Sequence, residues 1–136
     1  MDPLKLISTI ASSGMRAQSE RLQVVSENVA NAYSTSQTPG GEPYARKSVS
    51  FEAAKVGDVD AAIVQIGDIE QHDGSFKLRY EPTHPAADEN GYVKMPDVNP
   101  LIEMSNMREA ARSYEANLSM MENAREMRRL LVDLLR

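Results

Sequence analysis

The sequence contains no cysteine and no tryptophan, and it has only two histidines. The absence of cysteine excludes disulfide bridges, thiolate zinc sites and thiol nucleophiles, so the fold must rest on packing. No apolar run approaches the length of a membrane-spanning helix, and the first residues lack the apolar central region of a signal peptide. We therefore expect a chain without a cleavable signal peptide.

Charge is modest and mildly negative. The 136 residues include 20 acidic and 15 basic side chains, for a formal net charge of -5 and a pI near 5.0. A field of this sign gives no reason to expect nucleic acid as a partner. The length fits one ordinary domain and leaves no room for a second sizeable core.

The N-terminal segment, residues 1–32, predicts a long helix with a narrow apolar seam. Asp2 followed by Pro3 is typical of an N-cap and a first helical position. Apolar or small residues then recur in steps of three and four, with one polar member, which suits lengthwise packing on another helix. The seam comprises Leu4, Ile7, Ala11, Met15, Gln18, Leu22, Val25, Val29 and Ala32.

The C-terminal segment, residues 99–136, repeats these signals. Asn99 and Pro100 predict the start of a second long helix, and Glu103 places an acid in its first turn, where the helix dipole favours it. Neither glycine nor proline interrupts the segment after Pro100. The expected seam comprises Met104, Met107, Ala111, Tyr114, Leu118, Met121, Ala124, Met127, Leu131 and Leu134.

Between the helices, residues 33–98 have a different composition, with most of the prolines and six of the seven glycines. Residues 34–43 predict a flexible loop. Alternation predicts strands at 44–51, 61–69 and 75–80, with a turn at Asp73 and Gly74 and a short extended piece at 92–95. We expect these strands to form one small twisted sheet.

The predicted fold class is therefore α+β: two long terminal helices pack as an antiparallel, coiled-coil-like pair, and a small β-rich insert lies between them in sequence. A pair of helices that buries one stripe on each is marginally stable alone. Self-association would supply the missing burial.

Candidate chemical sites are weak. His84 has no clustered acid pair nearby, so a structural role in a turn is favoured over that of a metal ligand or general base. The stretch Asp88–Gly91 lacks the ligand pattern of a calcium loop, and we expect a turn there with Gly91 at positive φ. Gly40 and Gly41 lack the strand, lysine and helix of a phosphate-binding loop. The acids Asp58, Asp60, Asp68 and Glu70 favour a solvated surface. The sequence predicts no catalytic, metal-binding or cofactor-binding residue and no small-molecule substrate, and hence no enzyme.

Two motifs carry a resemblance to a known family. Asn28-Val29-Ala30-Asn31 ends the first helix, and residues 10–18 form a segment of small residues, glycine and glutamine. Together with the heptad-bearing C-terminal helix, they resemble the flagellar axial family of rod and hook proteins. Residues 80–93, and then 95–104 and 111–117, are similar to the proximal-rod subgroup of that family. The resemblance covers nearly the whole chain.

The resemblance implies a structural subunit of the proximal rod of the bacterial flagellar basal body. It implies synthesis in the cytoplasm, export by the flagellar type III apparatus and assembly into a helical tubular rod in the periplasm. The implied partners are copies of the chain, other flagellar rod proteins, inner-membrane ring junction proteins and the export apparatus.

Two sets of residues are candidates for these contacts. The predicted assembly interface comprises Leu22, Val25, Asn28, Val29, Asn31, Tyr114, Leu118 and Met121. The predicted lateral contact segment comprises Tyr80, Pro82, His84, Pro85, Asp88, Gly91 and Tyr92. Two alternatives stay open: another flagellar rod or hook-junction protein, and a coiled-coil adaptor or chaperone that does not polymerise.

Overall fold

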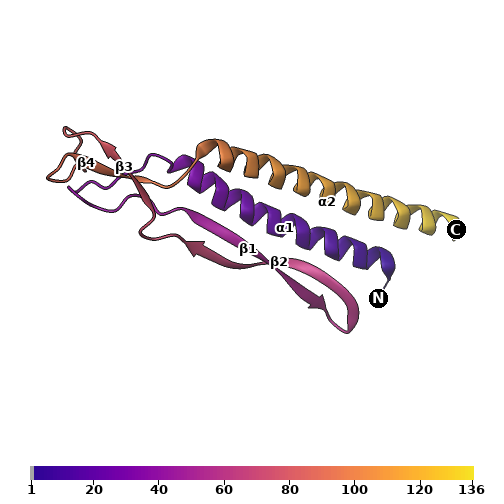
Figure 1. Ribbon diagram of the computed structural model, residues 1–136. Helices are drawn as coiled ribbons and strands as arrows, with labels where there is room; N and C mark the ends of the chain where they lie inside the picture. Colours follow the sequence, from indigo (N-terminus) through magenta and orange to yellow (C-terminus); the bar gives the residue numbers. More distant parts are fainter. Residues whose placement is uncertain (1) are drawn as a thin grey trace. The chain divides into compact units, whose positions relative to one another are not determined.

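The computed structural model describes residues 2–136; Met1, the first residue of the expected helical segment, lies outside the described residues. The elements follow in the order α1 (Pro3–Ala30), β1 (Lys47–Val56), β2 (Val59–Gln71), β3 (Phe76–Tyr80), β4 (Tyr92–Pro96) and α2 (Pro100–Leu134) (Figure 1). The predicted fold class is confirmed: two long terminal helices pair and a β-rich segment separates them in sequence.

Both helices begin where the sequence predicts. Asp2 Oδ1 accepts a hydrogen bond from the backbone N–H of Leu4 at 3.1 Å, and Asn99 Oδ1 accepts one from Leu101 at 3.1 Å. Each cap satisfies one of the N–H groups that have no partner inside a helix. The prolines at the first helical positions cost no hydrogen bond there.

The chain divides into two compact units. The first consists of the chain up to Leu22, Val49–Asp68 and Arg108–Arg136, and the second of Gln23–Ser48 and Ile69–Met107. Each unit therefore contains part of both helices, and each is described separately below.

In the first unit α1 and α2 run antiparallel. Arg21 pairs with Glu109 at 3.1 Å and Asp2 with Arg128 at 3.7 Å, so residue numbers fall along α2 as they rise along α1. Between these ion pairs, Gly14 lies against Asn117, and a Cβ built on Gly14 would lie 2.7 Å from the amide of Asn117. The buried residues Ala11, Ala17, Ala110 and Ala124 are also small. Small side chains allow the two helices to approach closely.

The first unit also contains most of the β1–β2 hairpin. The two strands form a two-stranded sheet and are joined by the two residues Gly57 and Asp58, so they are antiparallel. Gly57 has a φ of +55°, a conformation that glycine adopts at low cost. The backbone N–H of Val64 in β2 donates to Ser13 Oγ of α1 at 3.3 Å, which attaches the hairpin to the helix.

The second unit contains the other sheet, in which β3 and β4 pair antiparallel from Phe76 opposite Pro96 to Tyr80 opposite Tyr92. Val93 is fully buried, and Ala86 and Val98 are buried with it. Gly74 has a φ of +80°, as the predicted turn with Asp73 requires.

Two details of the sequence analysis were wrong. The strands form two separate two-stranded sheets, β1–β2 and β3–β4, in place of one sheet. The α2 seam is also wrong at its ends, because Met104, Met127, Leu131 and Leu134 are exposed. Glu103 and Ala110, which lie outside the predicted seam, are buried, and so is Ala124 within it. The predicted seam rests mainly on large apolar side chains, whereas the fully buried apolar residues of α2 are alanines.

Candidate functional site

The first asparagine of the Asn28–Asn31 motif lies at the centre of a buried polar network in the second unit. Asn28 is 1% exposed. Its Oδ1 accepts hydrogen bonds from the Tyr44 hydroxyl at 2.8 Å and from the backbone N–H of Lys47 at 2.9 Å. Its Nδ2 donates to the carbonyl of Lys47 at 2.7 Å and to Glu103 Oε2 at 3.4 Å. The side-chain amide is thus fully satisfied without water.

Glu103, in the first turn of α2, completes this network. It is 1% exposed, and Arg46 Nε donates to its Oε1 at 2.6 Å. A buried carboxylate is tolerated only when it is paired and hydrogen-bonded, and Arg46 and Asn28 supply these partners. We call Asn28, Tyr44, Arg46, Lys47 and Glu103 the Asn28 network.

The surroundings of this site shift the pKa values of Tyr44 and Glu27. Burial raises the pKa of Tyr44 above its ordinary value of 10.0. The hydrogen bond from Lys47 Nζ to Glu27 Oε2, at 2.9 Å, lowers the pKa of Glu27 below 4.5, and the opposite charge of Lys47 adds to this effect. Both groups therefore favour the protonation state in which they make these contacts at neutral pH.

The second asparagine of the motif closes the end of α1. Asn31 Nδ2 donates to the carbonyl of Glu27 at 2.9 Å, and Asn31 Oδ1 accepts from Ser34 Oγ at 3.0 Å. The same carbonyl also accepts a hydrogen bond from the backbone N–H of Asn31 at 3.0 Å, so the side chain adds a second bond where α1 ends. The two asparagines of the motif therefore have different structural roles.

The other residues of the predicted assembly interface differ in burial. Val25 is buried, whereas Leu22, Val29, Tyr114, Leu118 and Met121 are half-buried. The half-buried side chains keep apolar surface that a neighbouring chain could cover. Their role in assembly stays a prediction.

The predicted lateral contact segment is an ordered loop between β3 and β4. Asp88 Oδ1 accepts hydrogen bonds from the backbone N–H groups of Asn90 at 2.9 Å and Tyr92 at 3.0 Å, and Gly91 has a φ of +83°. Tyr80 and Tyr92 pack edge to face with ring centroids 5.3 Å apart, and both remain exposed. The loop thus presents a fixed aromatic pair to solvent.

The remaining residues of this segment have local roles. His84 Nδ1 accepts a hydrogen bond from the backbone N–H of Ala86 at 3.0 Å, as expected of a residue in a turn. Pro82 and Pro85 are exposed. Leaving aside the side chain of Asp60, which lies outside the described part, no group of three His, Cys, Asp or Glu side chains in residues 2–136 is arranged to hold a metal ion.

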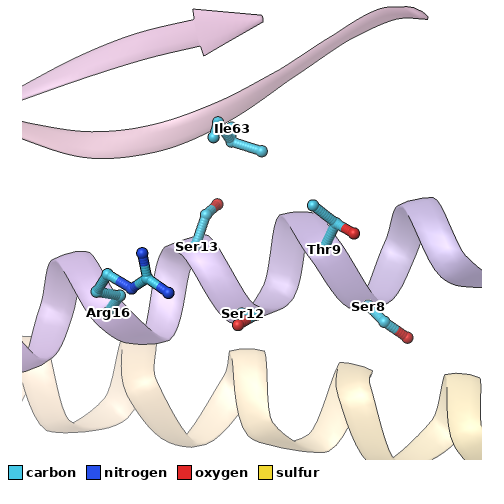
Figure 2. A pocket seen from close by; sticks show the side chains of 6 residues that line it. All are labelled: Ser8, Thr9, Ser12, Ser13, Arg16 and Ile63. Atoms are coloured by element: carbon cyan, nitrogen blue, oxygen red, sulfur yellow. The ribbon is translucent and has the colours of Figure 1, made fainter. Parts of the chain in front are cut away.

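A shallow groove of about 320 Å³ lies between α1 and β2 in the first unit (Figure 2). Ile63 lies across this groove from the hydroxyl residues of α1. Three of these hydroxyls donate to backbone carbonyls of the helix: Ser8 to Leu4 at 3.0 Å, Thr9 to Lys5 at 2.9 Å and Ser13 to Ile10 at 2.7 Å. A hydroxyl that donates to a backbone carbonyl has no base to activate it as a nucleophile.

Sequence reasoning missed Tyr44, Arg46 and the burial of Glu103. The helix dipole accounts for an acid at Glu103 without any burial. Alternation predicts a strand over residues 44–51, whereas β1 begins only at Lys47, so Tyr44 and Arg46 precede it. One signal was available: Glu103, Ala110, Asn117 and Ala124 repeat every seven residues, a polar and small stripe beside the large apolar one.

Comparison with known proteins gives matches along the whole chain. The model of the flagella basal body rod protein family matches residues 9–36, and that of the flagellar basal body rod FlgEFG protein C-terminal family matches residues 89–134. Flagellar basal-body rod protein FlgC of Agrobacterium fabrum is 50% identical over 138 residues, covering 100% of this chain and 98% of that protein. The chain belongs to the FlgC family of flagellar basal-body rod proteins.

More distant FlgC proteins also match most of the chain. FlgC of Escherichia coli is 40% identical over 121 residues, covering 89% of this chain and 90% of that protein. FlgC of Borreliella burgdorferi is 38% identical over 136 residues, covering 87% and 88%. The FlgC family is structural, and its name places it in the flagellar basal body. Neither long helix in the described part of the chain has the length and apolarity that a membrane span requires.

Proposed function

We propose that this chain is a non-enzymatic structural subunit of the proximal rod, exported by the flagellar type III apparatus and assembled into a helical tubular rod. The observation that carries the proposal is the 50% identity to a FlgC protein along the full chain. This alignment covers both helices and the insert between them.

The surface of α2 supports a role in assembly. Many of its large apolar side chains are exposed, and they continue past Arg128, where α2 makes its ion pair with Asp2 at the start of α1. The exposed residues in this last part are Leu130, Leu131, Val132, Leu134 and Leu135, and Leu134 and Leu135 are 82% and 88% exposed. A run of uncovered leucines is typical of a surface that another chain buries.

The proposed partners are copies of the chain, other rod proteins, inner-membrane ring junction proteins and the export apparatus. The half-buried seam residues of α1 and α2 would meet adjacent copies, and the Tyr80–Tyr92 loop would make lateral contacts. The chain would be made in the cytoplasm and exported to the periplasmic rod. The fixed, exposed aromatic pair supports the lateral role because it offers contact area at low entropic cost.

The experiment that tests the proposal replaces the native gene with an epitope-tagged copy and examines swimming and isolated basal bodies by electron microscopy. We expect the deletion to lack rods, and the tag to be recovered at the inner-membrane end in the complemented strain. Normal basal bodies in the deletion strain would refute the proposal and favour a coiled-coil adaptor.

A point variant tests the seam itself. Leu118→Asp should leave expression intact and abolish rod assembly, because a charge would be buried between subunits. Ser119→Asp, on the neighbouring exposed position, is the matched control and should still build rods. Rods and normal swimming in the Leu118→Asp strain would show that subunits do not meet at this seam.

A further inference from the structure

Two polar side chains are fully buried where α1 and α2 meet in the second unit, and both belong to the Asn28 network. Asn28 and Glu103 are each 1% exposed and touch through Nδ2 and Oε2 at 3.4 Å. The other partners, Tyr44, Arg46 and Lys47, come from a third stretch of chain. The network therefore closes only when the end of α1, the start of α2 and residues 44–47 are all in place.

Apolar contacts alone specify the pairing of these helices poorly. The buried residues of the two helices in the first unit are all small: Ala11, Gly14 and Ala17 on α1, and Ala110 and Ala124 on α2. Surfaces so similar can pair with each other, with themselves or one heptad out of register at comparable cost. Closely packed copies would bring many such surfaces together.

We propose that the Asn28 network is a specificity determinant, which selects the antiparallel α1–α2 pair in one register over slipped pairs and over α1–α1 or α2–α2 pairs. This role rests on the proposed function, since subunits in a rod hold the helices of neighbouring copies at high local concentration. In a wrong pair Asn28 keeps its hydrogen bonds to Tyr44 and Lys47 but loses the one to Glu103. The buried Glu103 carboxylate loses both Arg46 and Asn28.

The size of this preference follows from the cost of unpaired buried groups. A buried polar group left without its hydrogen bonds disfavours a pairing by about 5- to 150-fold, and a carboxylate such as that of Glu103 by more. Replacement of both groups by apolar side chains of similar shape removes the buried carboxylate and amide. Tyr44, Arg46 and Lys47 then lose partners, but all three are half-buried and can bond to water, so the helices can still pair. Selectivity and stability can therefore be separated experimentally.

The test uses engineered cysteines, which are unambiguous because the chain has none of its own. Gly14→Cys with Asn117→Cys reports the native register, since a Cβ on Gly14 would lie 2.8 Å from Asn117 Cγ. Gly14→Cys with Ala110→Cys or with Ala124→Cys reports a slip of one heptad. Single cysteines at 14 or 117 report α1–α1 or α2–α2 pairs as disulfide-linked dimers.

Each reporter is placed in the full-length parent, in Asn28→Leu/Glu103→Met, and in a control, Arg21→Met/Glu109→Met. The control removes an ion pair between the same helices whose glutamate side chain is 68% exposed. Oxidation is followed on non-reducing gels, and helix content by circular dichroism.

In the parent and the control we expect the native disulfide to exceed slipped and intermolecular products by about tenfold or more. In Asn28→Leu/Glu103→Met we expect retained helix content and slipped or dimeric products within about threefold of the native one. If this variant gave the same ratio of native to slipped and dimeric disulfides as the parent, the proposal would be wrong. Loss of the helix signal in Asn28→Leu/Glu103→Met would also overturn the proposal, because the network would then be a requirement for folding. A parent chain that forms no native disulfide would overturn it as well. Because the reporters are read on the purified chain, a chain that selects its register yet is absent from basal bodies would refute only the proposed function.

Discussion

Gly14→Ala should destabilise the chain even though alanine is the better helix former. In the middle of a helix, glycine costs about 0.5–1 kcal/mol relative to alanine, so the substitution gains that amount. The added Cβ would lie 2.7 Å from Asn117 Nδ2 and Oδ1, closer than atoms in contact can approach. Asn117 cannot yield freely, because its Nδ2 donates to the carbonyl of Ser113 at 2.8 Å. Overpacking of this kind costs about 1–3 kcal/mol, so the net loss should lie between about 0 and 2.5 kcal/mol.

The sign should reverse once Asn117 is truncated. In an Asn117→Ala background the new methyl group has room, and Gly14→Ala should stabilise by about 0.5–1 kcal/mol. The double-mutant cycle therefore predicts a coupling of about 1–3 kcal/mol between the two positions. Urea unfolding followed by circular dichroism measures all four chains. Gly14→Ala that stabilises the parent, or a coupling near zero, would refute the close approach of α1 and α2 at this point.

Three further predictions concern the second unit. Gly91→Ala should lower the thermal unfolding temperature more than Gly74→Ala. Both glycines have positive φ, but a Cβ on Gly91 would lie 2.9 Å from the Tyr80 ring, whereas a Cβ on Gly74 would meet open space. Equal decreases in the unfolding temperature would contradict this loop geometry. Tyr44→Phe should lower the free energy of unfolding by about 0.5–1.5 kcal/mol, because it deletes the hydrogen bond to Asn28 Oδ1, and an unchanged urea midpoint would argue against that bond. Lys47 lowers the pKa of Glu27 below 4.5, so their contact should stabilise the fold above pH 4.5 and lose this effect as the pH falls through the lowered pKa. At low salt, Lys47→Met should remove this part of the pH dependence of the free energy of unfolding. An identical pH profile in the parent and in Lys47→Met would show that the pair is not formed in solution.

The parts of the fold that depend on neighbouring residues were predictable from sequence. The caps at Asp2 and Asn99 are local signals, because an N-cap side chain binds a backbone N–H two residues ahead. The positive φ of Gly74 and Gly91 follows from turn composition for the same reason. Two long amphipathic helices without a large core between them have few options other than to pair.

The parts that depend on distant residues were not predictable. Glu103 is acceptable as an exposed acid in a first helical turn, and only the arrival of Arg46 makes its burial possible. Likewise, Ala110 lies outside the predicted seam, and its small size matters only because α1 approaches α2 closely at Gly14. The division into two sheets depends on which strands meet, and alternation within each strand carries no such information.

The first unit is discontinuous, built from the chain up to Leu22, Val49–Asp68 and Arg108–Arg136, and this has a kinetic consequence. The ion pair between Arg21 and Glu109 joins residues 88 positions apart, so it closes a long loop. Proteins dominated by contacts of this range fold slowly, and a ribosome adds only about 5–20 residues per second. The face of α1 that packs against α2 stays uncovered until α2 has been synthesised. The first unit therefore completes its packing only late in synthesis.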